Sequence, residues 1–103
     1  MSTPEGLIQS AICDYLALKK YFFFRSNTTP IFSEGRFRRM GKYAKTGVSD
    51  IILVKDGIFH GIEVKRAGGT LSASQKAFKA ELEAAGGRYE VVTSIDDVIK
   101  CGL

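Results

Sequence analysis

Residues 48–65 read VSDIILVKDGIFHGIEVK, two apolar segments rich in β-branched residues that flank a polar centre. β-Branched residues favour strands, and Asp56-Gly57 between two such segments is the strongest short-range signal for a two-residue hairpin turn. The stretch therefore predicts a β-hairpin in which Lys55 pairs with Ile58.

This pairing places Asp50 directly opposite Glu63. Opposed side chains share a face with their Cβ atoms about 5 Å apart, and two like charges so placed are destabilising unless something sits between them. Because side chains alternate between faces, Lys65 lies on the face of Glu63, whereas His60 lies on the other and is interpreted as structural. A turn longer by one residue would break the pairing.

Two carboxylates suit a hard cation such as Mg²⁺, which keeps several waters and accepts phosphate oxygens. The predicted substrate is a phosphodiester, with Lys65 orienting the attacking water or stabilising developing negative charge. The alternative is a structural ion pair of Lys65 with one acid on an exposed sheet face.

Before the hairpin, a helix is expected from Pro4 onward. Its apolar face is expected to include Leu18 beside residues at helical spacing, namely Gln9, Ile12 and Leu16. The aromatic run 21–24 predicts a buried strand, and the glycine-punctuated residues 26–47 predict a basic loop.

After the hairpin, residues 72–75 have the S-x-x-Q form of a capping box. They open a helix that Gly86-Gly87 ends and that presents one side formed by Phe78, Leu82 and Ala85. A strand at 88–93 and a short helix capped by Ser94 and running to about Cys101 complete the chain. The element order is helix, three strands, helix, strand, helix, in a single domain spanning 1–103.

Two helix residues point toward the hairpin site. Glu5 lies at the end of the core-facing stripe and is a candidate third acid ligand; the alternative is a favourable charge at the helix N-terminus. Gln75 shares a stripe with the apolar residues of its helix, which directs its amide inward, although the capping box alone would explain it. Tyr15 and Tyr89 are expected at the edge of the core.

The composition fits one compact globular domain. The 103 residues carry a net charge of +4, which suits a polyanionic partner such as DNA. Cys13 and Cys101 form no metal-ligand pair and are expected to be buried thiols. No apolar run approaches the roughly 20 residues of a membrane helix, and residues 1–6 lack the layout of a secretory signal, so a cytoplasmic location is expected.

The basic loop is the expected DNA contact. Its candidate phosphate ligands are Arg36, Arg38, Arg39, Lys42 and Lys45. Arg25 and Arg66, near the hairpin, are expected to help hold the strand. The alternative is a solvated loop without a binding role.

Together these motifs resemble the PD-(D/E)xK nucleases. Four segments in particular look like the virus-type replication-repair nuclease (VRR-NUC) branch, namely GVSD at 47–50, IEVK at 62–65, GTLS at 69–72 with the following Gln75, and AAGG at 84–87. Ser49 stands where many superfamily members have proline, which is common in this branch. The likeness runs over nearly the whole chain.

The resemblance implies an α/β fold, a restriction-endonuclease-like core in which helices flank a central mixed sheet. It maps metal binding to the Asp50 and Glu63 side chains and the Val64 carbonyl, and the catalytic lysine to Lys65, with supporting roles for Gln75 and Glu5. It also implies Mg²⁺ or Mn²⁺ dependence. Stand-alone members of this size are phage or bacterial proteins that tend to act as homodimers on branched DNA such as four-way junctions.

Two other functions stay open. One is a non-catalytic DNA-binding module in which both acids merely pair with basic neighbours. The other is a sequence-specific restriction-type endonuclease, which is less favoured because the chain has no spare domain for reading bases. A structure-directed endonuclease is the preferred hypothesis.

Overall fold

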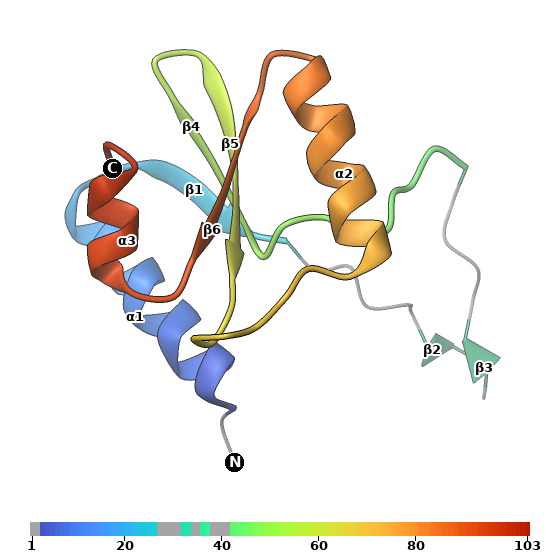
Figure 1. Ribbon diagram of the computed structural model, residues 1–103, viewed down its shortest axis with the longest axis horizontal. Helices are drawn as coiled ribbons and strands as arrows, with labels where there is room; N and C mark the ends of the chain where they lie inside the picture. Colours follow the sequence, from blue (N-terminus) through green and yellow to red (C-terminus); the bar gives the residue numbers. More distant parts are fainter. Residues whose placement is uncertain (1–2, 27–31, 34–35, 38–41) are drawn as a thin grey trace.

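The computed structural model describes residues 3–26, 32–33, 36–37 and 42–103. Its elements are α1 (Pro4–Leu18), β1 (Phe22–Arg25), β2 (Phe32–Ser33), β3 (Arg36–Phe37), β4 (Ile51–Lys55), β5 (Ile58–Val64), α2 (Ala73–Ala84), β6 (Arg88–Val92) and α3 (Ile95–Lys100) (Figure 1). The predicted order is confirmed, with the short pair β2–β3 added. No helix in the described ranges has the length and apolar character needed to cross a bilayer.

A mixed four-stranded sheet in the order β1-β4-β5-β6 forms the centre of the fold. Strand β4 is antiparallel to both β1 and β5, while β6 is parallel to β5 because α2 forms the crossover between them. The hairpin has the predicted register, with Lys55 paired to Ile58 and Ile51 to Ile62. Asp56 and Gly57 have φ values of 53° and 77°, the left-handed pair that a type I′ turn requires.

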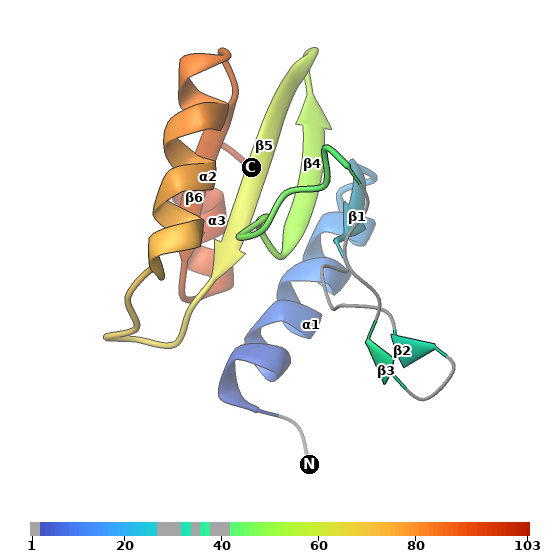
Figure 2. The same ribbon diagram turned by 90° about the vertical axis from the view of Figure 1, so that its right-hand side faces the viewer.

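Helices cover the two faces of the sheet unequally. Helices α1 and α3 pack on one face and α2 on the other (Figures 1 and 2). The main core lies on the α1/α3 face and consists of Ile12, Leu16, Ile51, Leu53, Ile62, Val64, Val92, Val98 and Leu103. On the α2 face, Phe78 packs against Tyr89 with ring centroids 6.2 Å apart. The α2 face is therefore the less filled side, and it is the side on which polar groups gather.

Side-chain capping fixes where the helices begin. The Thr3 hydroxyl accepts from Gly6 N at the start of α1, and the Ser94 hydroxyl accepts from Asp97 N at the start of α3. The capping box predicted at Ser72 is present in full. Its effect is to set the first turn of α2, which contributes directly to the polar site.

Several expectations about burial were wrong. Leu18 is 83% exposed because it follows buried Leu16 by two residues, about half a helical turn, and so points away from the sheet. The aromatic strand is not buried, since β1 is an edge strand and Phe22 and Phe24 lie on the part of the α2 face that the helix leaves uncovered. Cys13 and Cys101 are free and only partly buried. The span 26–47 is not all loop, because β2 and β3 pair antiparallel within it.

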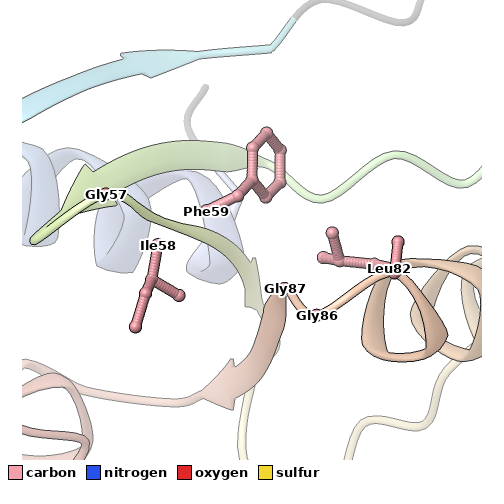
Figure 3. A pocket seen from close by; sticks show the side chains of 7 residues that line it. Gly57, Ile58, Phe59, Leu82, Gly86 and Gly87 are labelled. Atoms are coloured by element: carbon pink, nitrogen blue, oxygen red, sulfur yellow. The ribbon is translucent and has the colours of Figure 1, made fainter.

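A cavity of about 330 Å³ opens between the hairpin tip and the end of α2 (Figure 3). Its lining consists of Gly57, Ile58, Phe59, Leu82, Ala85, Gly86 and Gly87. None of these residues carries a titratable side chain or a nucleophile. The cavity is therefore a poor candidate for a reaction site, and the polar cluster at the other end of β5 is the better one.

Candidate active site

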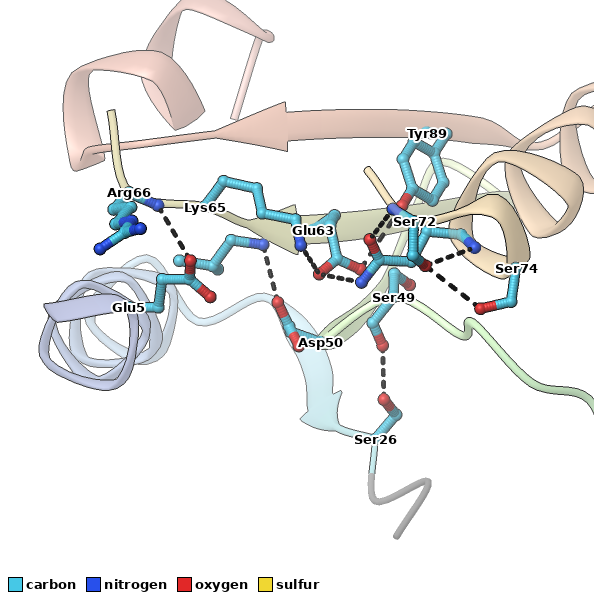
Figure 4. A network of polar contacts seen from close by, with 12 residues as sticks. Glu5, Ser26, Ser49, Asp50, Glu63, Lys65, Arg66, Ser72, Ser74 and Tyr89 are labelled. Atoms are coloured by element: carbon cyan, nitrogen blue, oxygen red, sulfur yellow. Dashed lines mark hydrogen bonds and ion pairs between the residues drawn. The ribbon is translucent and has the colours of Figure 1, made fainter. Parts of the chain in front are cut away.

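Asp50 and Glu63 lie together on the α2 face of the sheet, as the hairpin register predicts (Figure 4). Asp50 immediately precedes β4, and its Oδ2 accepts a 2.8 Å hydrogen bond from the backbone N–H of Val64 on β5. The Asp50 side chain also lies within hydrogen-bonding reach of Glu63. A short link across the end of the hairpin thus holds the two acids side by side.

Glu63 is buried, with only 2% of its surface exposed, and three polar or charged side chains surround its carboxylate. Gln75 Nε2 donates to Glu63 Oε2 at 3.2 Å, and the Tyr89 hydroxyl donates to Oε1 at 3.4 Å. The Lys65 Nζ lies 4.0 Å from Oε2 and the lysine side chain is 14% exposed. A buried carboxylate without such partners would be strongly unfavourable, so the cluster accounts for how Glu63 is tolerated.

Burial and the neighbouring Asp50 raise the pKa of Glu63 from 4.5 to about 8, whereas the Lys65 ammonium acts in the opposite direction. Burial and the charge of Glu63 likewise raise the pKa of Tyr89, which keeps its phenol protonated as a donor. At neutral pH the pair of acids therefore holds a proton in place of a second negative charge.

This raised pKa predicts how the stability of the metal-free protein depends on pH. Between pH 4.5 and about 8 the folded state keeps a Glu63 proton that the unfolded state has lost. The free energy of unfolding should therefore fall as the pH rises through this window, by at most about 1.4 kcal/mol per pH unit. Urea denaturation in EDTA at several pH values measures the slope. In Glu63→Gln the slope should shrink, and an unchanged slope would assign the effect to other groups.

Gln75 has both of the roles that its spacing allowed. Its Oε1 accepts from the Ser72 backbone N–H at 2.8 Å, which completes the capping box. Its Nε2 then points the other way and reaches Glu63. Since one amide makes both contacts, the first turn of α2 is tied to the acid on β5.

Glu5 lies near this site without joining the two acids. Its Oε2 accepts from the Arg66 backbone N–H at 3.5 Å, and both residues line a surface cavity of about 330 Å³ with Thr3 and Pro4. Within the part of the chain that the structure describes, no three acidic, histidine or cysteine side chains come close enough together to hold a metal ion. Glu5 is placed at the margin of the site rather than beside Asp50.

The structure places the predicted DNA-contact residues in different surroundings. Arg25 donates to Gln9 Oε1 on α1 at 3.1 Å. Lys45 forms an exposed ion pair with Glu81 of α2 at 3.4 Å, and Lys42 Nζ lies 5.3 Å from the ring centre of Tyr43. Arg36 belongs to β3, Arg66 is exposed just past β5, and Arg38 and Arg39 fall outside the described residues.

His60 lies on the opposite face from Glu63, as predicted from its odd spacing. It is 4% exposed, and burial lowers its pKa. Its Nδ1 has no hydrogen-bond partner among the described residues. Because the sheet lies between His60 and the two acids, His60 is a poor candidate for their general base.

Sequence reasoning missed two contacts that shape the site. Tyr89, expected only at the core edge, brings its hydroxyl to Glu63 from β6. Gly47 brings the loop before Asp50 against the backbone of Ser74 and Gln75 in α2. The parallel register that pairs Gly61 with Tyr89 would have revealed the first contact, but it depends on how α2 crosses over.

The donor set fits a hard divalent cation. Asp50 and Glu63 present carboxylate oxygens side by side, and the buried pair needs either a proton or a cation to relieve its charge. Oxygen ligands of this kind suit Mg²⁺ or Mn²⁺, with the remaining positions left to water or phosphate. Val64 stands between Glu63 and Lys65 in the sequence. Its backbone carbonyl stays a proposed third ligand.

Comparisons with known proteins identify a family and a fold. The family model for the VRR-NUC domain matches residues 33–96, more than half of the chain. A solved structure described as "VRR_NUC domain" matches with a TM-score of 0.67 and 20% identity, covering 96% of this chain and 94% of that one. A second, "VRR_NUC domain protein", has a TM-score of 0.61 and 18% identity, covering 98% and 86%. No curated protein matches.

The two solved structures share the fold, a restriction-endonuclease-like mixed sheet with flanking helices. The family match indicates nuclease activity, because VRR-NUC domains are nucleases of the PD-(D/E)xK type. The chain belongs to the VRR-NUC domain family.

Proposed function

We propose that this protein is a Mg²⁺-dependent, structure-directed DNA endonuclease that hydrolyses phosphodiester bonds, with Mn²⁺ able to substitute. The supporting observation is that Asp50, Glu63 and Lys65 share one face at the end of the hairpin, where Val64 N–H donates to Asp50 and Lys65 Nζ lies 4.0 Å from Glu63. The raised pKa of Glu63 adds to it, since two buried acids that compete for one proton favour a divalent cation.

In the proposed mechanism Asp50 and Glu63, together with the Val64 carbonyl, would hold the metal ion. When bound, the ion lowers the pKa of a coordinated water and offsets negative charge on the scissile phosphate. Lys65, whose ammonium lies on the same face, orients the attacking water or stabilises the charge that develops on the phosphate. Gln75 holds the Glu63 carboxylate from α2.

Branched DNA, such as a four-way junction, is the proposed substrate. The described residues form a four-stranded sheet, a short two-stranded sheet and three helices, and the basic residues near the site offer phosphate contacts, which give affinity without reading a base sequence. A homodimer would bring two such sites to one junction and cut two strands symmetrically. Sedimentation at micromolar protein tests the dimer, and a monomer at every concentration would remove it from the proposal.

The experiment for this function is a cleavage panel with labelled four-way junctions, flaps, duplexes and single strands. We expect the junction to be cut in Mg²⁺ or Mn²⁺, insensitively to its sequence, and no cutting in EDTA. Cutting of a plain duplex at one sequence would favour a restriction-type enzyme instead. Binding of junctions without any cutting would favour the non-catalytic module.

Basic residues of the span 36–45, with Arg25 and Arg66, are proposed to contact phosphates. Replacing Arg38 and Arg39 with alanine should weaken junction binding and lower the slope of log affinity against log salt by about two, since each lost phosphate contact removes about one. Binding measured at several salt concentrations in Ca²⁺ checks this. The double variant Lys19→Ala/Lys20→Ala, on two exposed residues after α1, serves as the charge-matched control. Equal slopes in all three proteins would exclude this segment.

A further inference from the structure

Glu63 receives one neutral donor on each of its two carboxylate oxygens. Gln75 reaches Oε2 from α2, and the Tyr89 hydroxyl reaches Oε1 from β6 at 3.4 Å. This second distance is longer than the usual 2.5–3.0 Å of a hydroxyl donor. The position of the tyrosine therefore depends on how firmly its ring is packed, not on the strength of this one bond.

The Tyr89 ring is buried and packs against α2. It is 7% exposed and lies against Phe78 of α2, with centroids 6.2 Å apart. Its partner in the parallel pairing is Gly61, and the space above Gly61 is occupied by the side chains of Ser49 and Leu82. A buried tyrosine hydroxyl needs a hydrogen-bond partner, and here the packing directs it to Glu63.

From these contacts we infer that Tyr89 is a positioning residue, which fixes the Glu63 carboxylate in the orientation that binds the divalent cation. The inference rests on the proposed metal-dependent function. A carboxylate has about four acceptor sites, so one bond to each oxygen restricts rotation and still leaves acceptor sites free. Both donors come from the α2 and β6 side, whereas Asp50 approaches from β4, so the oxygens stay open toward the second acid.

A purely structural role for Tyr89 makes a different prediction. If the residue served only to fill the space beside Phe78, phenylalanine would replace it without consequence for the metal. If the hydroxyl fixes Glu63, its removal should weaken cation binding about tenfold, the low end of what outer-shell partners of metal ligands contribute. We expect only a tenfold weakening of cation binding because the hydrogen bond from Tyr89 to Glu63 is long, at 3.4 Å.

The test compares Tyr89→Phe with Tyr15→Phe in the full chain. Tyr15 also loses one hydroxyl hydrogen bond, to the Leu103 carbonyl at 3.0 Å, but it belongs to α1 on the other face of the sheet. Mn²⁺ binding without DNA, measured by electron paramagnetic resonance, gives a readout that needs no catalysis. Junction cleavage across a Mg²⁺ series gives the second, and thermal melting shows that both variants fold.

We expect the Mn²⁺ dissociation constant to rise about tenfold in Tyr89→Phe and to stay unchanged in Tyr15→Phe. Cleavage by Tyr89→Phe should need more Mg²⁺ for half-maximal rate and recover at saturating metal. Wild-type Mn²⁺ affinity in Tyr89→Phe would overturn the inference and leave the proposed function standing. Failure of the wild type to bind Mn²⁺ or to cut would instead reject the proposed function itself. Equal weakening of Mn²⁺ binding in both variants would also overturn the inference about Tyr89, because it would indicate a general loss of stability.

Discussion

Asp50→Asn is expected to reduce DNA cleavage on the order of a thousandfold while the fold stays intact. The amide still accepts the hydrogen bond from Val64 N–H, so the end of the hairpin keeps its link. What is lost is one of the two proposed negative oxygen ligands, and bound metal contributes several kcal/mol to stabilising the transition state, about 4 of which correspond to this factor. Single-turnover cleavage of a labelled junction in saturating Mg²⁺ measures the change.

Asp14→Asn provides the matched control, because Asp14 is an exposed acid of α1. It should cut like the wild type. The melting temperature of Asp50→Asn should not fall, since the substitution removes a group that raises the pKa of buried Glu63. Comparable cutting by Asp50→Asn and the wild type would exclude Asp50 as a metal ligand and point to contamination or to another site.

Gly47→Ala is expected to destabilise the protein by about 3 kcal/mol or more, the range in which backbone strain and steric overlap combine. Gly47 has a φ of 73°, which costs a residue with a Cβ about 1–2 kcal/mol. The added Cβ would also lie 2.3 Å from the carbonyl oxygen of Ser74 and 2.7 Å from the nitrogen of Gln75. Both are backbone atoms of the first turn of α2, so either the loop or the helix must move.

Because this loop ends at Asp50 and this turn carries Gln75, cleavage should fall together with stability. For a domain of this size a loss of 3 kcal/mol lowers the melting temperature by roughly 10–20 °C. Gly57→Ala separates strain from overlap, since Gly57 has a similar φ of 77° but no atom within 4 Å of the added Cβ. It should cost only the strain and keep full cleavage. Equal losses in the two variants would argue against a contact between the loop and α2.

The central part of the site was predictable because it depends on local rules. A two-residue turn at Asp56-Gly57 fixes the hairpin register, and the register fixes that Asp50 and Glu63 share a face. The opposite placement of His60 follows from the same alternation. The capping box at Ser72 is likewise a local signal that the structure reproduces.

The features that were missed depend on packing between distant elements. Phe22 and Phe24 are exposed because α2 does not cover their part of the sheet, and the sequence of β1 does not contain this information. The contact from Tyr89 to Glu63 depends on the parallel register of β6. The spacing of Gln75 allowed either the capping box or a contact with the site. It could not show that the oxygen and the nitrogen of one amide make both contacts.

The most direct test of the account is a crystal of the wild-type protein soaked in Mn²⁺, with anomalous diffraction used to locate the metal. The account predicts a peak between the carboxylates of Asp50 and Glu63, and no such peak in crystals of Asp50→Asn. Occupied Mn²⁺ sites elsewhere, with no peak between these two side chains, would contradict the account.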